Sequence, residues 1–193
     1  GEALKNKDGG YFEYTSRSLS KEVIATTDEE LAKEIGTYAN TNHYGPILFE
    51  IGYRSTYAGL ETVMTGMKVG GKAKFILPPW LTVTGANGNE WEEQSSTIYE
   101  IELKEIITDI VKWEKDTMRR YIASHYPGLD TLSSNFYFKK LHDAKADTIK
   151  SKSVNVRYIG RLLEGWVFDT NIADTAKKYG IYDSSSDYEA LSY

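Results

Sequence analysis

The sequence predicts a mixed fold of β-strands and short helices that occurs twice along the chain. Residues 14–38 align without a gap on residues 158–182 at a constant offset of 144, and nine of the 25 aligned pairs are identical. A repeat of this length exceeds one solenoid unit and indicates tandem domains. Segments that alternate apolar and polar residues, interrupted by short helical segments, supply the elements of the first unit.

The composition excludes several classes of function. The chain of 193 residues is 40% hydrophobic and has a net charge of −5. Without a basic block, it is a poor partner for nucleic acid. No apolar run is long enough for a transmembrane helix. The absence of cysteine excludes disulfides, thiolate metal ligands and a cysteine nucleophile.

The elements of the first unit follow from periodicity and capping. Phe12 and Tyr14 alternate with polar neighbours, which predicts a half-buried strand. A helix is expected after Thr27, whose hydroxyl is followed by three acidic residues suited to the positive end of a helix. The remaining elements are predicted as strands over 46–51, 72–77 and 97–106, a helix over 57–67 and a polar loop over 82–94.

A change of period at Ile110 marks the end of this unit. Residues 110–126 carry an apolar stripe at helical spacing, and Pro127-Gly128 ends that helix. We therefore divide the chain into a domain over 1–108, a connector helix over 109–128, and the N-terminal part of a second domain over 129–193. The second copy offers only 36 residues from Tyr158 onward, too few to bury a core of their own.

The sequence motifs of common catalytic sites are incomplete or absent in this chain. Residues 66–73 approach a phosphate-binding loop, but Ala73 replaces the magnesium-binding hydroxyl and a strand follows, so a nucleotide is rejected. His43, His125 and His142 are scattered, which argues against a metal site. The acidic runs 28–30 and 90–93 are interpreted as a helix start and a solvated loop. No cofactor is expected.

Three groups of motifs resemble the FKBP family. Residues 154–170 (VNVRYIGRLLEGWVFDT) resemble the opening of an FKBP domain. Three segments resemble the middle of the same domain: Gly59-Leu60-Glu61, residues 66–72 (GMKVGGK) and Leu77-Pro78-Pro79. Residues 97–106 resemble its closing strand. The resemblance covers 10–106 as an entire domain and about 135–193 as the first part of another. It implies an α+β fold, in which a bent antiparallel sheet wraps on a short helix.

The resemblance also implies an activity, peptidyl-prolyl cis-trans isomerisation, which requires no nucleophile, acid or metal. Carried over by motif, the substrate pocket of the first unit falls on Tyr14, Ile24, Ala25, Tyr57, Leu60, Val83 and Tyr99. Ile24 and Ala25 stand where the family has Phe-Asp, Leu60 where it has tryptophan, and Val83 where it has a loop tyrosine. The second unit keeps Tyr158, Phe168 and Asp169, which we expect to be catalytic, with Asp169 as a buried acceptor.

The leading hypothesis is a tandem FKBP-type folding helper that acts on proline-containing or unfolded polypeptides, with weak or no activity in the first unit. The alternative is a catalytically weak peptide-binding or chaperone module on the same scaffold. A third hypothesis is a structural protein that self-associates through 110–126. Residue 1 is glycine, which fits a removed signal segment or a tag remnant, and a bacterial cell envelope or periplasm is the expected location.

Overall fold

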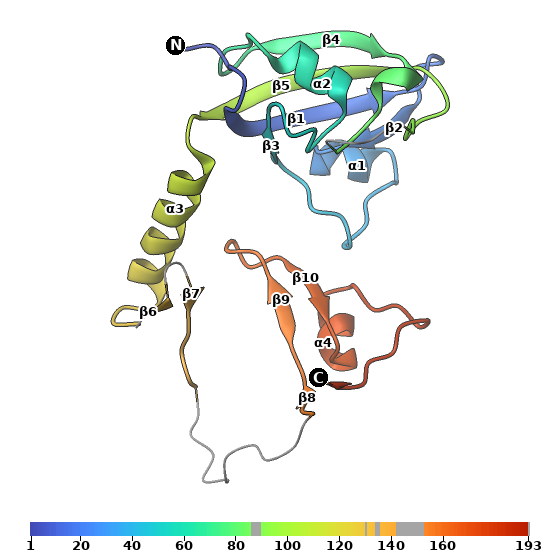
Figure 1. Ribbon diagram of the computed structural model, residues 1–193. Helices are drawn as coiled ribbons and strands as arrows, with labels where there is room; N and C mark the ends of the chain where they lie inside the picture. Colours follow the sequence, from blue (N-terminus) through green and yellow to red (C-terminus); the bar gives the residue numbers. More distant parts are fainter. Residues whose placement is uncertain (86–89, 130, 134–135, 142–152, 193) are drawn as a thin grey trace. The chain divides into compact units, whose positions relative to one another are not determined.

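The computed structural model describes residues 1–85, 90–129, 131–133, 136–141 and 153–192. Two compact units divide the chain, one formed by residues 1–38 and 44–114, the other by residues 39–43 and 115–193. The elements, labelled in Figure 1, are β1 (Gly9–Arg17), β2 (Val23–Thr26), α1 (Glu29–Glu34), β3 (Ile47–Glu50), α2 (Ala58–Met64), β4 (Lys72–Leu77), the 3-10 helix η1 (Pro79–Leu81), β5 (Thr97–Ile107), α3 (Ile110–His125), β6 (Thr131–Ser133), β7 (Phe136–Tyr137), β8 (Asn155–Val156), β9 (Ile159–Arg161), β10 (Val167–Thr170), α4 (Ala173–Lys178) and β11 (Leu191–Ser192).

The first unit is built on a five-stranded antiparallel sheet. The strands follow the order β2-β1-β5-β4, and β3 also pairs with β1. The β1–β5 pairing runs from Gly9 opposite Ile107 to Arg17 opposite Ile98, with an irregularity between Tyr11 and Phe12. Such a bulge bends the strand and increases its twist, and α2 lies against the curved sheet (Figure 1). The predicted α+β fold, a bent antiparallel sheet on a short helix, is confirmed.

The core lies between α2 and the inner face of the sheet. Alternation along β5 points Tyr99, Ile101 and Leu103 inward, where they meet the buried side chains of α2 and the neighbouring strands. A side-chain carbon at Gly59 would lie 2.1 Å from Leu77 Cδ1, so the glycine lets α2 approach β4 closely. The buried cluster consists of Leu4, Phe12, Phe49, Ile51, Leu60, Met64, Leu77, Tyr99, Ile101 and Leu103.

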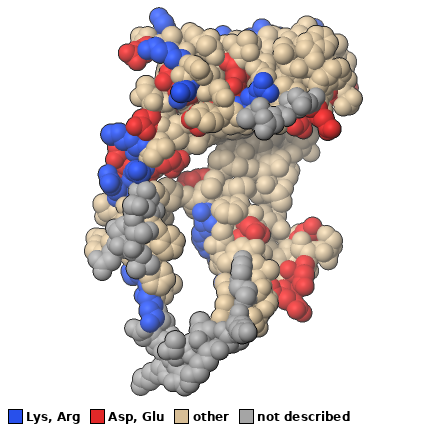
Figure 2. Space-filling model, viewed as in Figure 1, with Lys and Arg blue, Asp and Glu red and all other residues tan. Residues whose placement is uncertain are grey.

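The outer face of the sheet is charged. Lys104 lies 2.9 Å from Glu13 and 3.2 Å from Glu102. Figure 2, which views the first unit from the side of α2, shows acidic and basic side chains among uncharged ones on that opposite side. A shallow groove of about 490 Å³ runs over the outer face, lined by side chains that include Lys72 and Glu100. Exposed ion pairs of this kind contribute about 0–1 kcal/mol each, so they add little to stability.

The sequence repeat is also a structural repeat, when each unit is considered by itself. Val23–Thr26 (β2) and Val167–Thr170 (β10) are strands at the offset of 144, and Glu29–Glu34 (α1) and Ala173–Lys178 (α4) are helices at the same offset. The strand registers agree as well. Ser16 is paired with Ala25 in the first unit, and Gly160 is paired with Asp169 in the second.

Corresponding hydrogen bonds and ring contacts recur with this offset. The backbone nitrogen of Tyr14 donates to Thr27 Oγ1 at 2.9 Å, and that of Tyr158 donates to Asn171 Oδ1 at 2.9 Å. Beyond the aligned segment, the rings of Tyr38 and Tyr44 stack at 5.2 Å, and those of Tyr182 and Tyr188 stack at 5.0 Å. The similarity therefore continues past residue 182.

The helix expected over 110–126 is α3, which ends one residue earlier, at His125. None of its residues is buried. Within the described ranges, no helix has both the length and the apolar character needed to cross a membrane. His142, one of the scattered histidines, lies outside the described residues.

Candidate functional site

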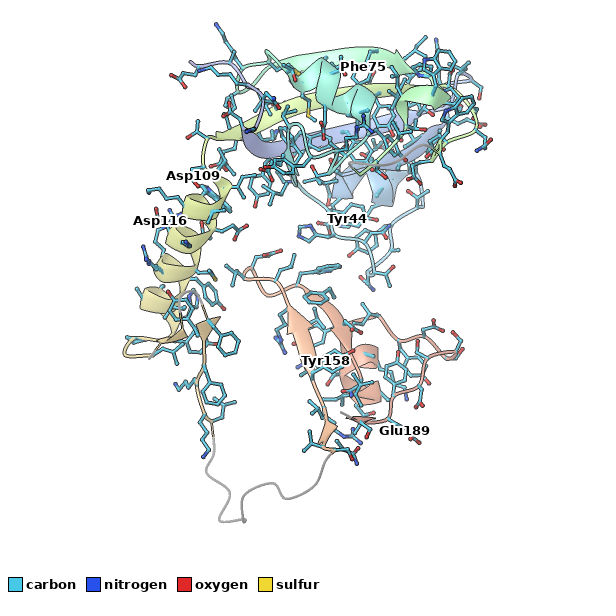
Figure 3. All side chains as sticks on the ribbon, in the orientation of Figure 1. Tyr44, Phe75, Asp109, Asp116, Tyr158 and Glu189 are labelled. Carbon is cyan, nitrogen blue, oxygen red and sulfur yellow. The ribbon has the colours of Figure 1, made fainter. Side chains whose placement is uncertain are left out.

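Aromatic rings from three strands gather on the inner face of the first unit. Tyr14 of β1 lies next to Tyr99 of β5, with ring centroids 5.7 Å apart. Phe75, which β4 contributes (Figure 3), stacks on Tyr99 at 6.0 Å. Leu60 of α2 is 4% exposed and belongs to the same cluster. Together these side chains form an apolar surface with tyrosine hydroxyls at its edge.

Tyr57 adds a further ring and a carboxylate partner. It is the N-terminal capping residue of α2, and its ring packs against the buried cluster. Its hydroxyl donates a hydrogen bond to Glu93 Oε1 at 3.2 Å. The next residue, Ala58, donates from its backbone nitrogen to the Val83 carbonyl at 3.0 Å. The start of α2 is thereby joined to the loop that follows η1.

The tyrosine hydroxyls of this site remain protonated well above neutral pH. Burial raises the pKa of Tyr14. Burial, followed by the charge and hydrogen bond of Glu93, raises the pKa of Tyr57 to about 12. The pKa of Tyr99 is raised by burial first and then by the charges that Tyr57 and Tyr14 would carry. All three hydroxyls are therefore neutral donors under physiological conditions.

The structure brings four of the predicted pocket residues into one cluster: Tyr14, Tyr57, Leu60 and Tyr99. The other three lie at or outside its edge. Ile24 is 57% exposed, Ala25 is half-buried on β2, and Val83 is half-buried in the loop after η1.

Interpreting residues 90–93 as a solvated loop was wrong for Glu93. Its side chain is half-buried, and it accepts a hydrogen bond from Tyr57, 36 residues away. Glu90, Trp91 and Glu92 are exposed, as expected of a loop. No local sequence pattern distinguishes Glu93 from the three residues before it, because its partner Tyr57 lies on another element.

The second unit holds a tyrosine–carboxylate pair at the repeated position. The Tyr158 hydroxyl donates to Asp169 Oδ2 at 2.6 Å, a distance typical of a strong hydrogen bond to a charged acceptor. Figure 3 labels Tyr158 beside β9. In the first unit the corresponding residues are Tyr14 and Ala25, and alanine offers no acceptor. The two copies therefore differ in the polar group next to this tyrosine.

The expected burial of Asp169 was wrong, because the residue is exposed. Phe168 is also 50% exposed, although one side of its ring is covered. A side-chain carbon at Gly160 would lie 2.7 Å from that ring, so only glycine lets Phe168 lie across β9. Trp166 lies nearby, with its ring centroid 6.4 Å from that of Phe168. The Tyr158–Asp169 pair is thus formed by the residue that precedes β9 and a residue of β10, and its carboxylate is exposed.

The described residues contain no group of three or more histidine, aspartate or glutamate side chains placed to hold a metal ion. The first site instead combines apolar ring faces, neutral hydroxyl donors and one carboxylate. Such a surface can remove water from a peptide segment and orient its carbonyl groups by hydrogen bonding. The chemistry of these side chains therefore suits contact with uncharged, apolar groups.

A model of the FKBP-type peptidyl-prolyl cis-trans isomerase family matches residues 13–104. No curated protein matches the chain. The solved structures that resemble it include the three FKBP domains of wheat FKBP73, at 19% identity, a TM-score of 0.42, and coverage of 56% of this chain and 42% of that one. FkpA from Escherichia coli is 21% identical with a TM-score of 0.37, covering 55% of this chain and 43% of that one.

A multi-domain immunophilin from Arabidopsis thaliana is 16% identical with a TM-score of 0.40, covering 55% of this chain and 38% of that one. The chain spans about two fifths of the length of these solved structures. The matched segment contains the bent sheet, α2 and the four clustered pocket residues. Residues 13–104, a little under half of the chain, therefore match the family of FKBP-type peptidyl-prolyl cis-trans isomerases.

Proposed function

We propose that the chain is a folding helper that binds proline-containing polypeptide segments and accelerates cis-trans isomerisation of their X-Pro bonds. The observation that carries this proposal is the cluster of Tyr14, Tyr57, Leu60 and Tyr99 inside the segment that matches the isomerase family. Rotation about a peptide bond has a barrier of about 18–20 kcal/mol, because the C–N bond has partial double-bond character. A pocket that fits the twisted amide better than the planar one lowers this barrier without a nucleophile.

The residues of the first site have distinct roles in this proposal. The faces of Tyr14 and Tyr99 and the buried Leu60 surround the proline ring and exclude water from it. The neutral hydroxyls donate hydrogen bonds to carbonyl groups of the bound segment. Two residues weaken this pocket. Ala25 offers no hydrogen-bond acceptor, and the side chain of Ile24 is exposed. We therefore assign the first unit weak catalysis and substantial peptide binding.

We further propose that residues 129–193 form the N-terminal part of a second FKBP-like domain, joined to the domain at 1–108 by the connector at 109–128. The repeated registers and hydrogen bonds support this division. In that domain Tyr158, Phe168 and Asp169 are the proposed catalytic residues. The Tyr158–Asp169 hydrogen bond supports this role, because it orients a hydroxyl and a carboxylate beside an aromatic ring.

The alternative function is a peptide-binding or chaperone module without significant catalysis. The specific observation in its favour is Ala25, which removes the carboxylate that Asp169 supplies at the corresponding place in the second unit. Binding of an apolar segment needs only the ring faces. It would protect unfolded chains from aggregation even where isomerisation is not accelerated.

A single set of measurements on the whole chain separates these functions. Cis-trans exchange of an Ala-Leu-Pro-Phe peptide is followed by NMR exchange spectroscopy, and aggregation of an unfolded client is followed by light scattering. The proposal expects faster exchange, which Tyr99→Leu reduces in part and Asp169→Ala reduces further. Suppressed aggregation with unchanged exchange would establish the alternative. Failure of both assays would exclude both functions.

A further inference from the structure

Glu93 places a negative charge against the aromatic pocket of the first unit. Its Oε1 accepts the hydrogen bond of the Tyr57 hydroxyl at 3.2 Å, and its side chain is half-buried. Tyr57 in turn packs against the core cluster that contains Leu60 and Tyr99. The pocket therefore holds a carboxylate, although the position on β2 occupied by Ala25 supplies none.

The protein itself fixes the position of this carboxylate. The Glu93 backbone nitrogen donates to Thr82 Oγ1 at 3.0 Å, and the Glu92 backbone nitrogen donates to the Thr82 carbonyl at 3.2 Å. Thr82 is fully buried, and its hydroxyl donates to the Pro79 carbonyl at 2.6 Å. These bonds join the two ends of the loop at the pocket edge. Glu93 is therefore held in place before any ligand binds.

The carboxylate has acceptor capacity that the pocket does not use. An ionised carboxylate has two oxygens and about four lone-pair sites, of which Tyr57 occupies one. In the described part of the chain, no lysine or arginine forms an ion pair with Glu93. Glu92, whose charge also acts on Tyr57, adds to the negative potential at this edge.

We infer that Glu93 makes the first pocket select proline-containing segments with a lysine or arginine next to the proline. This inference rests on the proposed function of that pocket as a site for such segments. The proline occupies the ring faces, and the neighbouring cationic side chain reaches the second oxygen of Glu93. A segment with glutamate at the same place meets repulsion instead, so the pocket discriminates by charge.

The expected size of the preference follows from the nature of the contact. A hydrogen bond that involves charged groups in a partly buried site corresponds to about a tenfold change in affinity. Repulsion of an acidic neighbour widens the difference between the two segments. Because the site is at an edge, salt reduces the preference.

The experiment measures binding of fluorescein-labelled peptides to the full chain by fluorescence anisotropy. Two series are used, Ala-X-Pro-Phe and Ala-Pro-X-Phe, with X as lysine, leucine or glutamate, so that both neighbours of proline are sampled. Glu93→Gln keeps the size and the acceptor for Tyr57 but removes the charge. Glu105→Gln, an exposed residue of β5, makes the same charge change as a matched control.

The inference expects the lysine peptide of at least one series to bind about tenfold more tightly than the leucine peptide. Glu93→Gln should abolish this preference, so that the lysine and leucine peptides bind with equal affinity, while Glu105→Gln should preserve it. Equal binding of the lysine and leucine peptides to the unmodified chain would overturn the charge selection alone. A preference that survives Glu93→Gln would assign it to another residue. Failure of every peptide to bind would overturn the proposed function and this inference together.

Discussion

Thr82→Val tests whether a single buried hydroxyl holds the edge of the first pocket. Thr82 is fully buried; its hydroxyl donates to the Pro79 carbonyl and accepts from the Glu93 backbone nitrogen. Valine has nearly the same shape but can make neither bond. The substitution therefore removes two hydrogen bonds without leaving a large cavity.

The expected loss in the free energy of unfolding depends on the hydrogen bonds that Pro79 and Glu93 retain. The Pro79 carbonyl still accepts from the Thr82 backbone nitrogen at 2.9 Å, so its loss is limited to about 1 kcal/mol. The Glu93 backbone nitrogen loses its acceptor in a partly buried bond, and leaving a donor unsatisfied costs about 1–3 kcal/mol. The expected decrease in the free energy of unfolding of the first unit is about 2–4 kcal/mol. Thr82→Ser keeps the hydroxyl and should cost only about 1 kcal/mol for one buried methyl group.

Hydrogen exchange of the amides in β5, measured by mass spectrometry on the full chain in increasing urea, reports unfolding of the first unit alone. A loss of that size lowers the urea midpoint by about 1–2 M, given typical denaturant slopes. Affinity for an X-Pro peptide should fall as well, since Glu93 and Tyr57 lose their fixed positions. A Thr82→Val variant as stable as Thr82→Ser would refute this account of the pocket edge.

Three further outcomes are expected. Asp169→Ala in the full chain should lower isomerase activity with the fold intact; unchanged activity would mean that the second pocket is not the working one. Gly160→Ala should displace the Phe168 ring, and unaltered ring proton shifts in NMR spectra would contradict this. Because burial and Glu93 raise the pKa of Tyr57 to about 12, the unfolded chain releases its proton first, near pH 10. The contribution of Tyr57 to stability is therefore fully present below pH 10 and is lost between pH 10 and about 12, which tyrosinate absorbance and circular dichroism can follow.

Much of the fold was predictable because its signals are local. Period-2 alternation marked β4 and β5, and a polar residue followed by acidic ones marked the start of α1. The choice of Thr27 as the capping residue was wrong, because the side chain of Asp28 accepts from the backbone nitrogens of Glu30 and Leu31. The predicted helix over 57–67 was too long, since α2 covers Ala58–Met64. Residues 65–67 retain helical spacing of apolar residues, but Gly66 has a φ of +89°, which a continuing helix does not allow.

Only those residues of the candidate site that lie within the family motifs were predictable from the sequence. The inward faces of the elements that carry Tyr14 and Tyr99 are fixed by strand alternation, and that of α2, which carries Leu60, by helical spacing. Their convergence therefore follows from the fold. Glu93 and the exposure of Asp169 depend on tertiary contacts instead. The backbone nitrogens of Glu92 and Glu93 donate to Thr82, which holds Glu93 next to Tyr57, and no periodicity encodes these contacts.

The comparison of the two copies explains how the pocket could diverge without loss of the fold. The corner between the first two strands is held by bonds from the Tyr14 backbone to Thr27 and from the Tyr158 backbone to Asn171. These bonds use the residue two positions after Ala25 or Asp169, and not the carboxylate itself. The side chain of Asp169 accepts an exposed hydrogen bond from Tyr158, which adds little stability. The residue at this position is thus free to change with function, and in the first unit a carboxylate from a distant loop reaches the pocket by another route.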